Sequence, residues 1–156
     1  YFSSHGPATE KDFSWWSGLT VADVKRGIEI VSSQLQKENV EGVDFWFAGK
    51  TKKSSSKRKA YLLSNYDEYT IGYTNHDVIF NPSYSALLGI LYPHSVVLDG
   101  QVIGGWRREF KKGLVLITVH LFRKILSSEY ALIEKASTIY GEFIGLTPEL
   151  KFTDHV

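Results

Sequence analysis

Two helix starts separated by a glycine turn fill the first third of the chain. Thr9 and Thr20 are each followed three residues later by an aspartate, the pattern in which the hydroxyl caps a helix while the acid reaches back to the first amide. After the second start, apolar residues recur at steps of three or four, which predicts an amphipathic helix over residues 21–33. Gly18 stands in the short turn between the two helices. This order is typical of a helix-turn-helix.

A strand pattern follows the second helix. Val43, Phe45 and Phe47 alternate along one face, as a half-buried strand requires. Glu41-Gly42 supplies a turn from a preceding strand, so these residues predict a β-hairpin. A hairpin directly after a helix-turn-helix is the wing of a winged-helix domain. We therefore predict such a domain over residues 1–49, with its first helix truncated because it would lie largely before the first residue.

A basic, serine-rich segment separates this region from the rest of the chain. Residues 50–59 contain six lysines or arginines, three serines and no acid, which is the composition of a flexible linker. The whole chain carries 18 Lys and Arg against 17 Asp and Glu, a net charge of +1. Because it lacks a strong overall field, any electrostatic binding of nucleic acid has to be local.

Strand signals dominate the residues after this linker. Short apolar runs occur at residues 61–63, 95–98 and 114–121, and Asp99-Gly100 is a tight-turn dipeptide after the second run. A helix predicted over residues 128–144 ends at Gly145. The fold class predicted is α+β: a winged helix-turn-helix followed, over residues 60–156, by an antiparallel β-barrel-like domain with a C-terminal helix.

Residue types that carry metal and redox chemistry are scarce. The chain has no cysteine, which excludes disulfides, thiolate zinc sites, iron–sulfur clusters and a cysteine nucleophile. Its five histidines are scattered, without a spacing typical of zinc ligands. The sequence also lacks P-loop, dinucleotide-binding and Gly-x-Ser-x-Gly motifs and an apolar run of about 18 residues. We therefore expect no metal, no cofactor and no membrane contact, in a cytoplasmic protein.

Three motifs resemble one bacterial family of winged-helix DNA-binding proteins, which includes the AlkZ/YcaQ-type DNA glycosylases. They occur in the family's order: Ser4-His5-Gly6-Pro7-Ala8-Thr9 with Asp12-Phe13 and Trp16-Ser17-Gly18-Leu19; Asp67-Glu68-Tyr69 with Gly72-Tyr73; and Asp99-Gly100-Gln101-Val102 with Trp106-Arg107-Arg108. The resemblance implies tandem winged helices followed by a C-terminal β-barrel, with this chain as the C-terminal part. It also implies that the substrate is double-stranded DNA carrying alkylated or crosslinked bases.

The resemblance does not carry the family's catalytic motif onto this chain. Glycosylase members have a glutamine-x-glutamine or glutamine-x-aspartate pair near the N-terminus of the full protein, which makes a missing N-terminal part the expected partner of this chain. Gln34-Leu35-Gln36 has the same letters but lies where the second helix passes into the wing, so we assign it no catalytic role. Residues 74–77 also depart from the family, in which many members have an arginine after the glycine-tyrosine pair.

Two groups of cations are the candidate DNA contacts. In the helix over residues 21–33, acidic and basic side chains cancel, which makes sequence-specific reading of the major groove weak. Basic residues in the linker and around the second hairpin suit sequence-nonspecific binding of the duplex backbone instead. They are Lys52, Lys53, Lys57, Arg58, Lys59, Arg107, Arg108 and Lys111. The alternative is that these residues form an ordinary solvated surface.

Paired carboxylates beside aromatic residues mark a possible cleft at Asp67, Glu68 and Tyr69. A carboxylate beside a DNA-facing cleft could orient water or polarise a base. The structural alternative is that Asp67 caps a helical turn over 68–73 while Glu68 pairs with a cation. Trp15 and Trp16 could stack on bases, although we expect them to pack in the core or against a neighbouring domain.

These observations leave two functions open. The first is a DNA-binding module of an AlkZ-like glycosylase, which contacts the duplex backbone in base-excision repair while another part of the protein supplies the chemistry. The second is a non-enzymatic structural or interaction domain of a winged-helix paralogue, which the near-neutral charge favours.

Overall fold

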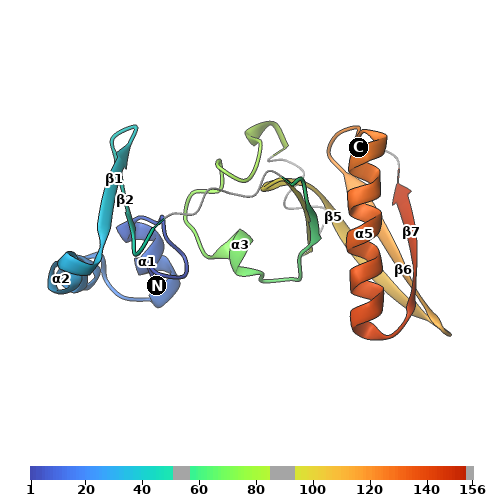
Figure 1. Cartoon of the computed structure of the whole chain (residues 1–156), viewed down its shortest axis with the longest axis horizontal. Coiled ribbons are helices and arrows are strands. Elements are labelled where there is room, and N and C mark those ends of the chain that lie inside the picture. Colours follow the sequence, from blue (N-terminus) through green and yellow to red (C-terminus); the bar gives the residue numbers. More distant parts are fainter. Residues whose placement is uncertain (51–56, 85–93, 154–156) are drawn as a thin grey trace. The chain divides into compact units, whose positions relative to one another are not determined.

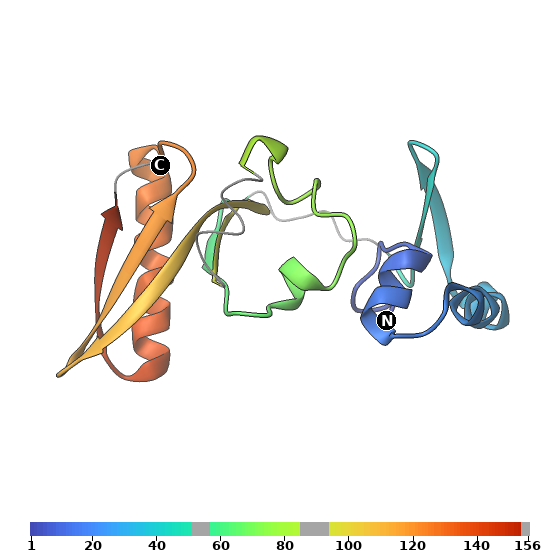
Figure 2. The same ribbon diagram turned by 180° about the vertical axis from the view of Figure 1, so that it is seen from behind.

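The chain folds into two compact units. The computed structural model describes residues 1–50, 57–84 and 94–153. The first of the two units, which we call the N-terminal unit, comprises the described residues of Tyr1–Ser55 together with Glu68–His76. The sheet unit comprises those of Ser56–Asp67 and Asp77–Val156. Figures 1 and 2 show the elements of each unit from opposite sides. The sequence did not indicate that residues 68–76 pack with the N-terminal unit, and the predicted boundaries at 49 and 59 stay predictions.

The N-terminal unit has the predicted pair of helices followed by a hairpin. Its elements are α1 (Glu10–Ser17), α2 (Val21–Val31), the 3₁₀ turn η1 (Ser32–Gln34), β1 (Gln36–Val40), β2 (Val43–Phe47) and α3 (Glu68–Ile71). Thr9 forms a full capping box with Asp12, and the Thr20 side chain accepts from the Asp23 amide. Strands β1 and β2 pair antiparallel. The two helix starts and the hairpin are confirmed, whereas the winged-helix assignment stays a prediction.

A small core holds the N-terminal unit together. Phe2, Ala8, Val24 and Ile28 are buried, and partly buried aromatic residues pack against them. Gly6 is required at this point because a Cβ there would lie 2.5 Å from the Phe2 carbonyl oxygen. The glycine of the first motif is therefore explained by packing.

The sheet unit is built on five strands in the order β3-β4-β5-β6-β7 (Figure 1). Its elements are β3 (Ala60–Leu62), the 3₁₀ turn η2 (Pro82–Tyr84), β4 (Ser95–Leu98), β5 (Gln101–Lys111), β6 (Leu114–Leu121), α5 (Ser127–Ile144) and β7 (Thr147–Thr153). Helix α5 lies against one face of the sheet, as both ribbon views show. The α+β class is confirmed, and the sheet is curled and open over the described residues.

The predicted sheet is wrong in one respect, because it is not wholly antiparallel. The final strand β7 pairs with β6 in the parallel direction. A strand that follows β6 through a helical crossover returns in the same direction, as in any β-α-β unit. The signal was present at residues 147–153, where half-buried Pro148, Leu150 and Phe152 alternate with exposed residues. No strand was predicted after the C-terminal helix, so β7 was missed.

The core of the sheet unit lies between the strands and α5. Alternate residues of β6 are buried, and Trp106 and Ile133 are almost fully buried among them. The Trp106 indole donates to the Leu63 carbonyl at 2.8 Å, which satisfies its N–H group inside the core. Gly104 allows β5 to approach β6, since a Cβ there would lie 2.2 Å from the His120 carbonyl oxygen.

Candidate functional site

The segment containing α3 is tied to α1 by one buried carboxylate. Asp12 Oδ1 accepts from both the backbone N–H and the hydroxyl of Thr74, each at 2.7 Å. Its Oδ2 accepts from the amide and hydroxyl of Thr9, each at 2.8 Å. Burial acts to raise the pKa of Asp12, but these hydrogen bonds from Thr74 and Thr9 outweigh it and lower that pKa below its ordinary value. An ionised Asp12 therefore holds residue 74 beside the start of α1.

A second set of polar contacts joins His5 to α3. The Tyr73 hydroxyl donates to the His5 carbonyl at 2.9 Å, and His5 Nε2 lies 2.6 Å from Glu68 Oε2. On the other side of the ring, Nδ1 lies 2.8 Å from Ser4 Oγ. Because a carboxylate can only accept, Nε2 carries the proton that bonds Glu68. Hydrogen bonds from His5 and Trp16 lower the pKa of Glu68, which is therefore ionised at neutral pH.

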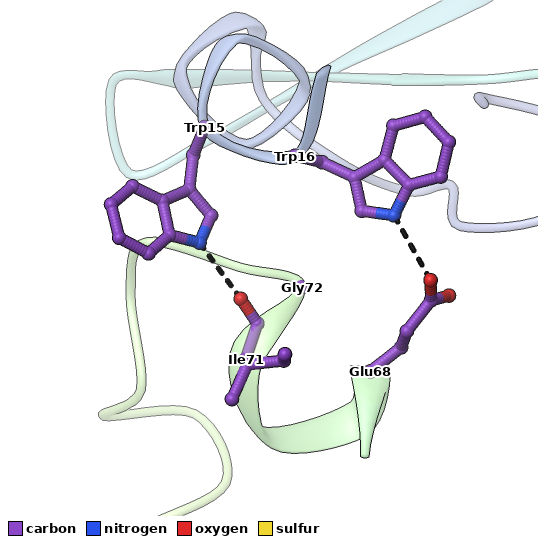
Figure 3. A pocket seen from close by; sticks show the side chains of 5 residues that line it. All are labelled: Trp15, Trp16, Glu68, Ile71 and Gly72. Carbon is purple, nitrogen blue, oxygen red and sulfur yellow. Dashed lines mark hydrogen bonds between the residues drawn. The ribbon is translucent and has the colours of Figure 1, made fainter. Parts of the chain in front are cut away.

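The two tryptophans of α1 stand over α3 and border a shallow pocket (Figure 3). Trp15 Nε1 donates to the Ile71 carbonyl at 2.8 Å, and Trp16 Nε1 donates to Glu68 Oε1 at 3.2 Å. The pocket has a volume of about 470 Å³ and is lined by Trp15, Trp16, Glu68, Ile71 and Gly72. Within the N-terminal unit Trp15 remains 66% exposed and Trp16 45% exposed. Of the two predicted alternatives, packing in the core is wrong, because both rings are largely exposed and their N–H groups are directed to α3; packing against a neighbouring domain stays a prediction.

The predicted cleft residues are only partly brought together. Glu68 begins α3 and lines the pocket, while Asp67 and Tyr69 are not among its lining residues. The predicted helical turn is confirmed over 68–71, and the cation expected beside Glu68 is in fact a histidine. Burial raises the pKa of Tyr69, so its hydroxyl stays protonated at neutral pH.

Ser4, His5 and Glu68 are the residue types of a nucleophilic triad, linked by hydrogen bonds. Their arrangement instead holds the Glu68 side chain in position. In a triad the base takes the serine proton while the acid orients the base. Here Ser4 and His5 are neighbours in one turn, and Ser4 Oγ also lies 3.2 Å from the Tyr1 carbonyl. Tyr1 stacks on the His5 ring with centroids 4.9 Å apart. This aromatic support and the two hydrogen bonds fix His5, and His5 in turn fixes Glu68.

The predicted cations of the linker have different environments. Lys52 and Lys53 lie outside the described residues. Lys57, Arg58 and Lys59 are exposed, but the Arg58 guanidinium donates to Asp99 at 2.6 Å and to Glu129 at 2.8 Å. The Lys59 backbone amide donates to Asp99 at 2.9 Å, a bond that does not involve its ammonium group. Arg58 therefore has a structural role in the sheet unit, whatever else it contacts.

The predicted cations of β5 are divided between the two faces of the strand. Arg107 and Lys111 share the face opposite the core, because side chains alternate along a strand. Arg108 is on the core face, where it pairs across the sheet with Ile117. Its guanidinium lies 5.8 Å from the Trp106 ring centroid and 5.9 Å from that of Tyr140. The sequence placed these cations in one group, whereas the pleat separates Arg108 from the others.

His94 is a neighbour of Arg108 that the sequence analysis did not single out. Its Nε2 lies 3.3 Å from Arg108 NH1. Burial and the charge of Arg108 lower the pKa of His94, so its neutral ring can accept from the guanidinium. His5 was likewise quoted only as part of a motif, and the residue that it meets is 63 positions away. A one-dimensional pattern could not have paired them.

Metal and membrane features are absent from the described part of the chain. Over residues 1–50, 57–84 and 94–153, no group of three or more His, Asp or Glu side chains is placed to hold a metal ion. In the same ranges, the helices are too short or too polar to cross a membrane.

Comparisons with known proteins agree with the motifs. The family model described as DNA glycosylase AlkZ-like matches residues 1–143. Among solved structures, the Streptomyces sahachiroi DNA glycosylase AlkZ superposes with a TM-score of 0.70 at 19% sequence identity, over 95% of this chain. The chain spans 42% of the length of that protein. A comparison with curated proteins gave no match. The fold is thus shared with AlkZ, and the family match over most of its length shows that this chain belongs to the AlkZ-like DNA glycosylase family.

Proposed function

We propose that this chain is a DNA-binding module of an AlkZ-like DNA glycosylase in the bacterial cytoplasm. In this proposal it grips the backbone of duplex DNA during excision of alkylated or crosslinked bases. Support comes from the family match over residues 1–143 and from exposed cations on the sheet unit. The chemistry would belong to an N-terminal portion of the whole protein. There a flipped base would be held in a pocket while water attacks the sugar carbon.

One observation carries the DNA-binding part of the proposal. Arg107 and Lys111 are exposed on the face of β5 that is directed away from the core. They lie four residues apart on one strand, which is about 13 Å at the usual rise. Glu109 lies between them on the same face, with its Oε1 3.8 Å from Lys111 Nζ. Because such an exposed ion pair is weak, the two cations can still contact two phosphates of one backbone without reading bases. Lys57 and Lys59 are further exposed cations of the same unit.

The proposal excludes two of the predicted cations from direct phosphate contact. Arg58 is engaged by Asp99 and Glu129, so turning it to DNA would leave Glu129, only 4% exposed, without one of its partners. Arg108 is exposed, but its guanidinium lies 5.8 Å from the centroid of the Trp106 ring and 3.3 Å from His94 Nε2. We assign to both a role in shaping the sheet unit.

The alternative function is that of an interaction domain without a catalytic partner. It is favoured by α2 and the β1–β2 hairpin, whose exposed charges include acids as well as bases. Exposed Ile30, Val40 and Val43 lie on these elements. An apolar, mixed-charge surface of this kind suits protein contacts better than phosphate.

Fluorescence anisotropy with two duplexes tests the proposal. One duplex is intact and the other contains an abasic-site analogue, and each is titrated at two salt concentrations. We expect salt-sensitive binding that is tighter on the abasic duplex. The double variant Arg107→Ala/Lys111→Ala should lower the slope of log K against log[salt] by about two, since each phosphate contact contributes about 0.9.

The matched control removes two exposed lysines elsewhere in the same unit, Lys124→Ala/Lys135→Ala. It lowers the net charge equally and should leave the salt slope almost unchanged. Equal losses in both double variants would mean a general charge effect and contradict a β5 interface. Absence of binding to either duplex at low salt would favour the interaction domain.

A further inference from the structure

The pocket of the N-terminal unit combines two exposed indoles with an ordered carboxylate (Figure 3). The DNA-binding proposal uses none of these groups. All five lining residues come from α1 and from the segment beginning at Glu68, so the pocket is complete within one compact unit.

The indoles can offer a ligand only their rings. An indole has a single N–H donor and no acceptor. Trp15 uses that donor on the Ile71 carbonyl and Trp16 uses it on Glu68. These bonds hold both rings in place while leaving Trp15 66% and Trp16 45% exposed. The exposed surface is therefore aromatic and preorganised, and the ring faces of tryptophan attract cations more strongly than those of tyrosine or phenylalanine.

Glu68 supplies the negative charge. Its side chain is 58% exposed, although His5 and Trp16 each contact one of its oxygens. A carboxylate has about four lone-pair sites, so two internal bonds leave it able to accept from an incoming donor. Because those bonds already fix its rotamer, little side-chain entropy remains to be lost on binding.

The pocket lining carries no basic residue opposite Glu68, and its partner His5 is not among the lining residues. Neither a lysine nor an arginine is among the five lining residues, and the only ionised group there is Glu68. A phosphate would be repelled by this carboxylate, which disfavours nucleic acid as the occupant. A planar guanidinium, in contrast, can stack on an indole and donate to a carboxylate at the same time.

From these contacts we propose that Trp15, Trp16 and Glu68 form a binding site for the arginine side chain of a protein partner. The site would act as an anchor point, since tryptophan and arginine dominate the binding energy of many protein interfaces. It is independent of DNA binding by the sheet unit.

A pair of isosteric peptides tests the site in the intact chain. The probes are acetyl-Gly-Arg-Gly-amide and the same peptide with citrulline, which has the shape of arginine without its charge. The readout is the indole N–H signals in NMR spectra, which separate Trp15 and Trp16 from Trp46 and Trp106. We expect arginine to shift the first two signals saturably and citrulline to bind about tenfold more weakly.

Two variants locate the charge. Glu68→Gln should weaken the arginine peptide about fivefold, because a neutral amide replaces the acceptor carboxylate. Glu38→Gln makes the same charge change at an exposed position of the same unit and should leave binding unchanged.

Several results would overturn the proposal. They are equal binding of the arginine and citrulline peptides, undiminished binding to Glu68→Gln, or equal binding of a lysine peptide, which would remove the assignment to arginine. Shifts of Trp15 and Trp16 by a single-stranded oligonucleotide, with none from the arginine peptide, would show a base-stacking site instead.

Discussion

Each unit has a buried carboxylate at the same position of a helix, and the two carboxylates are satisfied by different donors. Asp12 is the third residue of α1 and Glu129 the third residue of α5, and both are 4% exposed. Asp12 accepts from the amides and hydroxyls of Thr9 and Thr74. Glu129 instead accepts from the guanidinium groups of Arg58 and Arg123 as well as from a backbone amide.

The comparison shows that one local motif can fasten two kinds of remote segment. A carboxylate at the start of a helix satisfies free backbone amides there, and its remaining lone pairs are available to a second chain segment. Asp12 uses them to hold Thr74, 62 residues away, with neutral donors. Glu129 uses them to hold Arg58, 71 residues away, with a charged one. The two units should therefore respond differently to loss of the acid, to pH and to salt.

Removing Glu129 should have the largest effect. Glu129→Ala leaves two arginines without their shared acceptor and is expected to lower the free energy of unfolding of the sheet unit by about 3 kcal/mol. This lies at the lower end of the range for broken buried pairs, because both arginines are partly exposed. Urea titrations followed by backbone NMR signals report each unit separately. Glu134→Ala, at an exposed position of α5, is the control and should cost well under 1 kcal/mol.

Removing Asp12 should have a smaller effect, confined to the other unit. Asp12→Ala leaves amides of Thr9 and Thr74 without an acceptor and is expected to cost the N-terminal unit about 2 kcal/mol. The same titrations should show signals of residues 68–76 lost at lower urea than in the native chain. An equal loss of stability in both units would contradict the assignment of these residues to the N-terminal unit.

The sequence was a good guide wherever a signal was local. The threonine caps, the hairpin and the C-terminal helix, which was predicted over 128–144 and found over Ser127–Ile144, all follow from spacing within one element. The parallel strand β7 was missed because its seven residues contain a proline and short alternation, which helix-ending signals at Gly145 obscured. Pairing of β7 with β6 depends on long-range contacts, which the local sequence of such a segment does not predict.

The candidate site was less predictable because its parts come from distant segments. Glu68 was selected for being one of two adjacent acids, but its selection did not reveal His5 or the two indoles. Likewise, Arg58 and Arg108 look like free surface cations in a basic sequence. Only the fold shows that Arg58 meets two carboxylates and that Arg108 lies beside aromatic rings.

Acid should sharpen the difference between the two carboxylates. Hydrogen bonds from Arg123, Leu126 and Arg58 hold the pKa of Glu129 far below its ordinary value, and Asp12 is lowered as well. A lowered pKa stabilises the folded state above the unfolded pKa, and this stabilisation is lost as the pH falls toward the folded one. At pH 4 we expect a loss of about 0.6 kcal/mol from Glu129 and less from Asp12, given unfolded values of about 4.3 and 3.9.

The measurement is the urea midpoint of each unit at pH 7 and pH 4. Glu129→Gln cannot titrate, so its sheet unit should lose less stability over this interval than that of the native chain. A sheet unit whose acid loss is the same with glutamine at position 129 would show that other carboxylates determine it.

Added salt should cause the smallest difference in stability between the two units, and this difference reports directly whether the contacts of each carboxylate are ionic. The pairs of Glu129 with Arg58 and Arg123 are ionic, and the arginine side chains are 47% and 36% exposed, so that added ions screen them in part. Raising NaCl from about 0.15 M to 1 M should lower the stability of the sheet unit by a few tenths of a kcal/mol. The donors around Asp12 are neutral, so screening should change the stability of the N-terminal unit less. Since salt also strengthens apolar burial generally, the informative quantity is the difference between the native chain and Glu129→Gln within the sheet unit. A difference that stays constant from low to high salt would mean that the guanidinium groups act on Glu129 as hydrogen-bond donors alone, in the same way as Thr9 and Thr74 act on Asp12.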